Sequence, residues 1–173
     1  MIDYRIRENK GYFENMGVLV SMLEHSRAVT LQDISNLSQS DLDYLPEGSS
    51  NTIGALLLHI ASIEFVHQII TFENRDINDQ ERSKWGTALE LGDKARDEIK
   101  GLSLDYYLDV ISTTREMTLS LLASKDDNWL FEEKKWDNGI PYNHYWMWFH
   151  VMEDEINHRG QIRAIKRHLI NNR

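Results

Sequence analysis

The chain has 173 residues, with 28 acidic and 19 basic side chains that give a formal net charge of −9. This length favours one domain spanning residues 1–173, and a hydrophobic content of 41% is typical of folded globular proteins. The acidic balance argues against nucleic acid as a partner, because phosphate binding requires clustered Lys and Arg. Since the sequence contains no cysteine, it excludes disulfides, thiolate metal sites and cysteine nucleophiles.

Neither a membrane span nor a secretory leader is expected from the sequence. No uninterrupted apolar stretch reaches the ~18 residues that a membrane-spanning helix requires. Residues 1–10 carry several charges and no apolar segment, so they do not resemble a signal peptide. Together with the absence of cysteine, these features predict a cytoplasmic protein that does not bind membranes.

The first half of the chain contains two helical patterns. Residues 4–26 place apolar side chains at steps of three and four, which predicts a first long helix. Residues 32–50 are polar and predict a loop with one short helical turn. The N-cap residues at 49–52 then predict a second helix that ends near Phe72.

The second half of the chain predicts two more long helices. Residues 74–101 are a charged connection that carries a short helix between 85 and 99, and the third long helix begins where Ser103 can cap it. Residues 125–139 form a polar connection whose aromatic side chains pack back on the bundle. The fourth helix begins near Pro141 and ends near Ile170. Because β signals are scarce, we expect an all-α four-helix bundle with long crossover connections.

A polar pair interrupts an apolar stripe on the fourth predicted helix. The stripe steps by three or four residues through Met147, Val151, Asp154, His158, Ile162, Ile165 and Leu169. Asp154 and His158 lie one turn apart, so their side chains can converge on one divalent cation. A buried, ionised Asp154 requires a partner. That partner is His158, His150, a metal, a cation on another helix or water.

The second predicted helix offers two candidates for a third ligand, His59 and His67. They are separated by about 12 Å along the helix axis, so both cannot reach one ion. Periodicity alone does not choose between them, although it leans slightly toward His67. The alternative interpretation of the whole pattern is structural. In that case Asp154 and His158 form an ordinary helix ion pair, and the other histidine is a hydrogen-bonded packing residue.

Other side chains near this pattern are less informative. The aromatic residues at the start of the fourth helix either line the mouth of a pocket or pack in the core; they are Tyr142, Tyr145, Trp146 and Trp148. Glu153 and Glu155 are expected to be solvated or to pair with the basic end of the same helix. Because the chain has no phosphate-binding loop, nucleophile elbow or HExxH motif, no catalytic residue is assigned.

Two segments resemble the DinB-like superfamily, which includes the bacillithiol transferases and the mycothiol-dependent maleylpyruvate isomerases. Residues 150–161, HVMEDEINHRGQ, resemble its C-terminal signature. Residues 42–48, LDYLPEG, and 52–61, TIGALLLHIA, resemble its first histidine block. The resemblance implies a four-helix bundle whose divalent metal is held by His59, Asp154 and His158. Many relatives have His at the position of Asp154, whereas the isomerase branch has a carboxylate there.

The resemblance also implies a function. Two imidazoles and a carboxylate suit Zn²⁺, Ni²⁺, Fe²⁺ or Mn²⁺. Relatives of known activity use the metal to activate a low-molecular-weight thiol, so we expect a metal-dependent thiol S-transferase, or a hydrolase that activates water, with a small-molecule substrate. The resemblance further implies a homodimer. The alternative, which Asp154 favours, is a non-catalytic bundle that binds a ligand or a partner.

Overall fold

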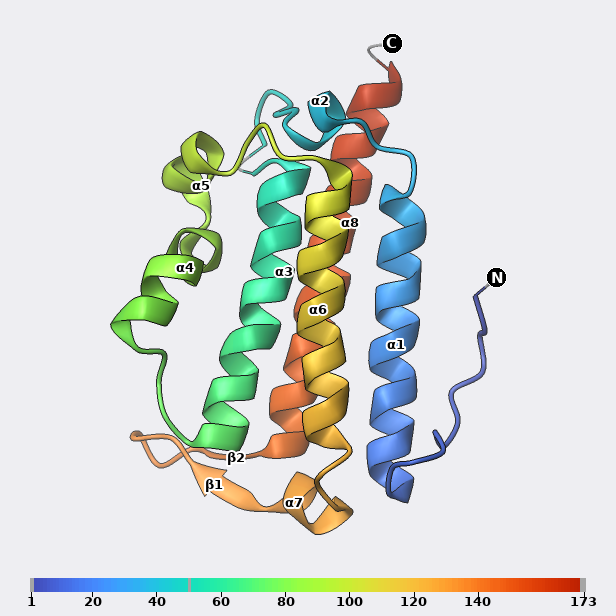
Figure 1. Ribbon diagram of the computed structural model, residues 1–173, viewed down its shortest axis with the longest axis vertical. Coiled ribbons are helices and arrows are strands. Elements are labelled where there is room, and N and C mark those ends of the chain that lie inside the picture. The colour runs from blue at the N-terminus through green and yellow to red at the C-terminus, as the bar shows by residue number, and fades with distance from the viewer. Residues whose placement is uncertain (1, 50, 172–173) are drawn as a thin grey trace.

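Four long helices form the body of the protein, as predicted. The computed structural model describes residues 2–49 and 51–171, and 69% of these described residues are helical. The long helices are α1 (Glu14–Ile34), α3 (Ile53–Gln68), α6 (Leu104–Leu122) and α8 (His144–Asn171). Helix α3 packs against α6 and α8, and α1 packs against α8 (Figure 1). The predicted all-α four-helix bundle is confirmed.

A long crossover returns the chain along the outside of the bundle. Helices α3 and α6 run in the same direction, so the chain must travel back between them (Figure 1). It does so through α4 (Asp79–Glu90) and α5 (Gly92–Glu98), where the sequence predicted one short helix. Leu91 divides the two with a φ of 56°. The π-helical segment η1 (Ile69–Glu73) continues α3, and α2 (Gln39–Leu42) is the short turn expected in the loop before it.

The first helix differs from the prediction at both ends. It begins at Glu14 and not near residue 4, and it continues past Ser26 to Ile34. Its start is fixed by Asp127 of α7 (Asp127–Phe131), whose carboxylate accepts backbone hydrogen bonds from Asn15 and Met16 at 3.0 Å each. This cap lies 112 residues away from Asn15 in the sequence, so local periodicity could not reveal it.

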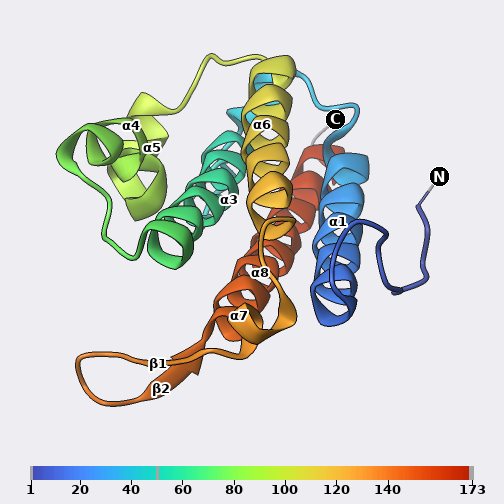
Figure 2. The ribbon, with the colours of Figure 1, turned by 60° about the horizontal axis from the view of Figure 1, so that its bottom comes forward.

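A small hairpin replaces the predicted start of the fourth helix. The strands β1 (Glu133–Lys135) and β2 (Pro141–Asn143) pair antiparallel, and the hairpin projects from the end of the bundle (Figure 2). Pro141 therefore belongs to a strand, and the prediction that it opens the helix was wrong. The Oδ1 atom of Asn143 accepts a hydrogen bond from the backbone of Trp146 at 2.8 Å, which caps α8. The strands are too short to show an alternating pattern.

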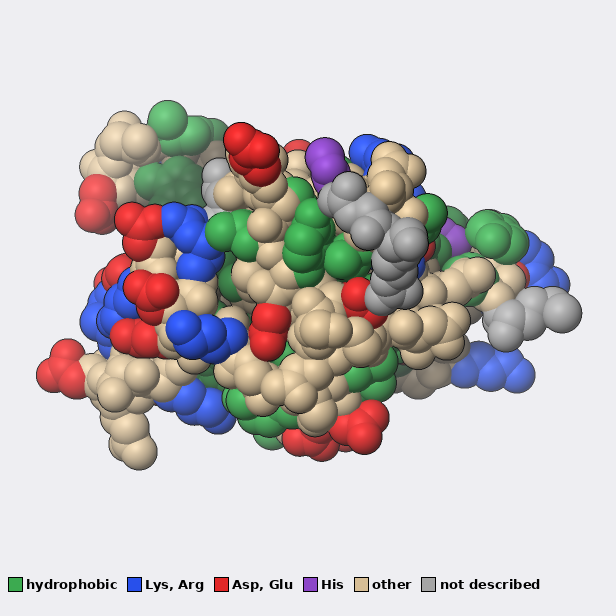
Figure 3. Space-filling view, turned by 90° about the horizontal axis from the view of Figure 1, so that it is seen from above, with side chains coloured by type: hydrophobic (Ala, Val, Ile, Leu, Met, Phe, Trp, Pro, Cys, Tyr) green, Lys and Arg blue, Asp and Glu red, His purple; other side chains and the backbone are tan. Residues whose placement is uncertain are grey.

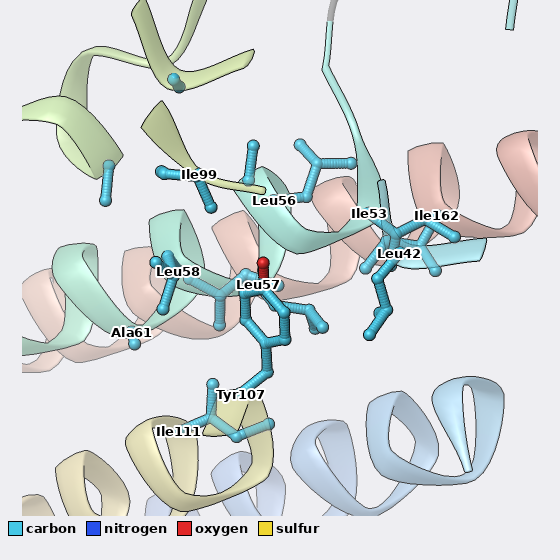
Figure 4. Packing of buried hydrophobic residues seen from close by; sticks show 14 of the residues in the cluster. Leu42, Ile53, Leu56, Leu57, Leu58, Ala61, Ile99, Tyr107, Ile111 and Ile162 are labelled. Atoms are coloured by element: carbon cyan, nitrogen blue, oxygen red, sulfur yellow. The ribbon is translucent and has the colours of Figure 1, made fainter. Parts of the chain in front are cut away.

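The hydrophobic core includes a large cluster around α3. Figure 4 shows the ring of Tyr107 reaching from α6 toward α3, and Leu42, Ile53 and Ile162 meeting at one end of the cluster. The segment Ile53–Glu73 is long and apolar enough to cross a membrane by length and hydropathy alone. However, 78% of its most apolar window is buried inside the bundle, as in the core helices of soluble proteins.

Acidic and basic side chains are interspersed on the face seen from above (Figure 3). At the C-terminal end of α8, Arg163 pairs with Asp33 of α1 at 2.6 Å. The acidic side chains therefore do not form one continuous negative patch on this face.

Four ionised side chains are buried between the long helices, one from each. Arg27 of α1 donates to Glu155 of α8 at 3.0 Å and to Glu64 of α3 at 2.8 Å. Arg115 of α6 donates to Glu64 at 2.6 Å and to Glu155 at 3.4 Å. Both glutamates are fully buried, so the expectation that Glu155 is solvated was wrong. Two positive and two negative charges compensate one another in this network.

The pKa of Glu64 makes this network sensitive to acid. Burial alone would raise it, but the charges of Arg115 and Arg27 and their hydrogen bonds outweigh burial and lower the pKa from 4.5 to about 2. Ionised Glu64 therefore stabilises the fold above pH 4.5, and this contribution is lost as the pH falls toward 2.

We predict that Glu64→Gln lowers the free energy of unfolding at pH 7 by about 3–5 kcal/mol, because an arginine loses its buried partner. The variant should also lose less stability than the wild type between pH 4.5 and pH 2. Urea denaturation at a series of pH values measures both effects. The matched control is Glu153→Gln, since Glu153 is exposed. Parallel pH curves for the wild type and Glu64→Gln would contradict the prediction.

Candidate metal site

The three predicted ligands come together where α3 packs against α8. Ligand atoms of His59, Asp154 and His158 all lie within 4.8 Å of one another. Both imidazoles direct Nε2 at the same carboxylate oxygen: Asp154 Oδ1 is 3.8 Å from His59 and 3.3 Å from His158. The two rings meet edge to face, with centroids 4.7 Å apart. Residues almost a hundred positions apart in the chain thus converge on a common point.

The orientation of His59 is set by a neighbouring helix. Its Nδ1 lies 2.8 Å from the backbone carbonyl oxygen of Ala88 in α4. A carbonyl oxygen can only accept a hydrogen bond, so Nδ1 must carry the hydrogen. In the neutral ring Nε2 therefore has a free lone pair that faces Asp154. This is how metal-binding histidines are usually oriented, by a hydrogen bond from the nitrogen that does not bind the metal.

The electrostatics of the three residues call for a positive charge between them. A lone pair on His59 Nε2 that faces an ionised carboxylate is repulsive unless a proton or a metal cation lies between. Two further polar atoms, Asp154 Oδ2 and His158 Nδ1, are buried without a hydrogen-bond partner among the described residues. The donor set of two imidazoles and one carboxylate fits Zn²⁺, Ni²⁺, Fe²⁺ or Mn²⁺. The site therefore fits a divalent cation.

Asp154 is held in its charged form. Burial raises its pKa, but the two imidazoles of His158 and His59 that face the carboxylate outweigh burial and hold the pKa of the carboxyl below its ordinary value of 3.8. The side chain is 15% exposed, so the site can be reached from solvent at its edge.

His67 and His150 lie outside the group of three. Their rings are 5.8 Å apart, two turns further along the contact between α3 and α8. His67 donates from Nδ1 to the carbonyl of Ile63 at 2.7 Å, and His150 Nδ1 lies 3.1 Å from Glu153. Periodicity left His59 and His67 as alternatives and leaned toward His67, and that preference was wrong, because the structure brings His59 into the group. Ala88 was not predicted, because a backbone carbonyl has no signature in the sequence.

We predict that Nδ1 of His59 carries a hydrogen in chelator-treated protein at pH 8. Two-dimensional ¹H–¹⁵N correlation of ¹⁵N-labelled histidine distinguishes the two tautomers, and His59→Gln identifies the signal. The Nδ1–H form follows from the Ala88 hydrogen bond. His67, which makes the same kind of bond to Ile63, is an internal control. A His59 ring with no hydrogen on Nδ1 would contradict the geometry.

The chain is similar to known proteins in both sequence and structure. The family model for mycothiol-S-transferase matches residues 18–171. A crystal structure of a protein from Streptococcus pneumoniae is similar with a TM-score of 0.69 and 17% identity, covering 90% of this chain and 92% of that one. A conserved protein from Enterococcus faecalis is similar with a TM-score of 0.66 and 15% identity, covering 89% and 96%. At these identities the two structures show the fold alone. None of the curated proteins matches in sequence.

Proposed function

This chain belongs to the mycothiol S-transferase family, a DinB-like family, and we propose that it is a metal-dependent enzyme that joins a low-molecular-weight thiol to a small electrophilic acceptor. The observation that carries the proposal is the convergence of His59, Asp154 and His158 within 4.8 Å. In the reaction the thiol sulfur forms a bond to an electrophilic carbon, the thiol loses its proton, and a leaving group departs from the acceptor. Water in place of the thiol would make the enzyme a hydrolase.

Each of the three side chains has a defined task in this proposal. When bound, a divalent metal supplies a Lewis acid that favours the deprotonated form of a thiol or of water near neutral pH. His59 is held in position by Ala88, and its Nε2 is free to bind. Asp154 supplies a negative charge that partly neutralises the ion. His158 is one turn from Asp154 on the same rigid helix, so the site does not depend on a mobile loop.

The proposal extends to the setting of the enzyme. We propose one domain over residues 1–173, a cytoplasmic location and a homodimer. The burial of the apolar helix α3 inside the bundle supports the absence of a membrane partner. The mixed charges on the face seen in Figure 3 give no basic surface there for nucleic acid.

We predict that protein purified without chelators contains about one divalent ion per chain. His59→Ala, Asp154→Ala and His158→Ala should each lose this ion, because each removes one of three ligands. Inductively coupled plasma mass spectrometry measures the content, and added Zn²⁺ or Ni²⁺ should raise the melting temperature of the wild type but not of these three variants. His67→Ala is the matched control and should keep its metal. Equal metal content in all four variants would refute the ligand assignment.

We predict that the metal-loaded protein conjugates mycothiol or a related thiol to an electrophile such as 1-chloro-2,4-dinitrobenzene. Loss of a ligand should lower the rate about 100-fold or more, since the metal is lost with it. Spectrophotometric assays across several thiols and electrophiles provide the measurement. Metal binding with no conjugation in any combination would favour the non-catalytic alternative, a bundle that binds a ligand or partner.

A further inference from the structure

The line of side chains on α8 that includes Asp154 and His158 continues beyond the candidate metal site, toward the start of the helix. Trp146, His150, Asp154 and His158 follow one another at four-residue steps, so they lie along one line of the helix surface. Asp154 and His158 belong to the candidate metal site. The two residues before them carry the line toward the start of α8, where the hairpin joins it (Figure 2).

Rings are in contact all along this continuation, which we name the aromatic row; it consists of Tyr142, Trp136, Trp146, His150 and His67. Trp136 stacks on Tyr142, with centroids 4.0 Å apart, and meets Trp146 edge to face at 6.3 Å. Trp146 lies parallel to His150 at 5.3 Å, and His150 contacts His67 of α3 at 5.8 Å. The aromatic row therefore runs from the hairpin to the contact between α3 and α8.

Core packing does not account for the aromatic row. A second set of rings does pack in the core: Trp148 is fully buried and lies between His67 and Phe72. In the aromatic row, by contrast, Trp136 is 39% exposed and Trp146 is 43% exposed. Large aromatic surfaces that are left in water side by side are typical of binding sites. Each of the two interpretations of these aromatic residues therefore holds for one of them. Trp148 packs in the core, and Trp146 lies at the surface.

We propose that the aromatic row binds the electrophilic acceptor, and that the acceptor it fits is an uncharged, planar aromatic molecule. This inference rests on the proposed thiol transfer. The aromatic row supplies flat ring surfaces. Two lysines, Lys134 and Lys135, lie beside it on the hairpin, but the acidic side chains of Glu132, Glu133 and Asp137 outnumber them, and Lys134 pairs with Glu132 at 3.2 Å. The carboxylates of Glu153 and Asp154 beside the aromatic row repel an anion. A cation would in turn be repelled by a divalent metal at the neighbouring site.

The position of His150 places such an acceptor next to the metal site. His150 and Asp154 are one turn apart, so their Cβ atoms are separated by about 6 Å. A molecule stacked over His150 and Trp146 consequently lies against the ligands and not at the far end of the hairpin. The exposed indole of Trp136 extends the same surface for the part of the acceptor that does not react.

The test uses 1,3-dinitrobenzene, which is planar and uncharged and has no leaving group. Binding is measured by ¹H–¹⁵N NMR of the indole groups in chelator-treated, full-length protein, so it requires neither metal nor thiol. The Trp146 and Trp136 signals should shift on titration. Trp146→Ala and Trp136→Ala should each raise the Kd about five-fold or more, and Trp146→Phe, which keeps a ring, should restore much of the affinity.

The matched control is Phe131→Ala. Phe131 is an exposed aromatic residue at the same end of the molecule that stacks on Tyr145, outside the aromatic row, so its loss should leave the Kd unchanged. A second probe, 3,5-dinitrobenzoate, differs from the first by one carboxylate and should bind at least about five-fold more weakly if charge matters as argued. Equal Kd values for Trp146→Ala and the wild type, or equal binding of the two probes, would overturn the proposal.

Kinetics separate this inference from the proposed function. With 1-chloro-2,4-dinitrobenzene, Trp146→Ala should raise the KM for the acceptor and leave the KM for the thiol unchanged. Conjugation that is insensitive to Trp146→Ala would refute the aromatic row while the proposed function stands. Binding of dinitrobenzene at Trp146 in a protein that conjugates nothing would refute the proposed function and establish an aromatic-ligand site.

Discussion

The two arginines and two glutamates buried between the long helices fix how those helices lie against one another. Each helix contributes one charge, and each charge contacts partners on two or more other helices. Moving one helix by a turn, about 5.4 Å, would leave charges buried without partners. Apolar contacts tolerate repacking, whereas an unpaired buried charge is strongly destabilising. The network therefore selects one axial register for the bundle.

The geometry of the candidate metal site depends on this axial register. Glu155 points toward the arginines at the centre of the bundle, while Asp154, the residue before it, faces α3. On α3, Glu64 lies five residues after His59. When Glu64 and Glu155 are held by the same two arginines, His59 is brought opposite Asp154 and His158. The charges that stabilise the fold thus also position the ligands, although they contact no substrate.

How much of the fold and of the candidate site could be predicted depends on whether a feature is determined by the local sequence or by contacts between distant residues. Periodicity and caps identified the four helices, and a polar interruption of an apolar stripe identified Asp154 and His158. The same signal was available for the network of buried charges. Arg27 lies four residues after the buried Leu23, and Arg115 lies four residues after the buried Ile111.

Other features are tertiary and have no local signature. The start of α1 depends on Asp127, and the choice of His59 over His67 depends on how far α3 is displaced along α8. The hairpin strands are too short for a pattern. Glu155, by contrast, lies four residues after Val151 and three before His158 on the buried face of α8, so periodicity could have indicated its burial.

The carboxylate among the ligands connects the metal site with the aromatic row. Two neutral imidazoles and Asp154 leave a divalent ion with one net positive charge, whereas three imidazoles would leave two. That remaining positive charge would disfavour a cationic acceptor, while the carboxylates of Glu153 and Asp154 beside the aromatic row disfavour an anionic one. An uncharged acceptor then gains nothing from electrostatic attraction, and ring contacts must supply its binding energy. A line of exposed rings that begins one turn from Asp154 is the surface such an acceptor requires.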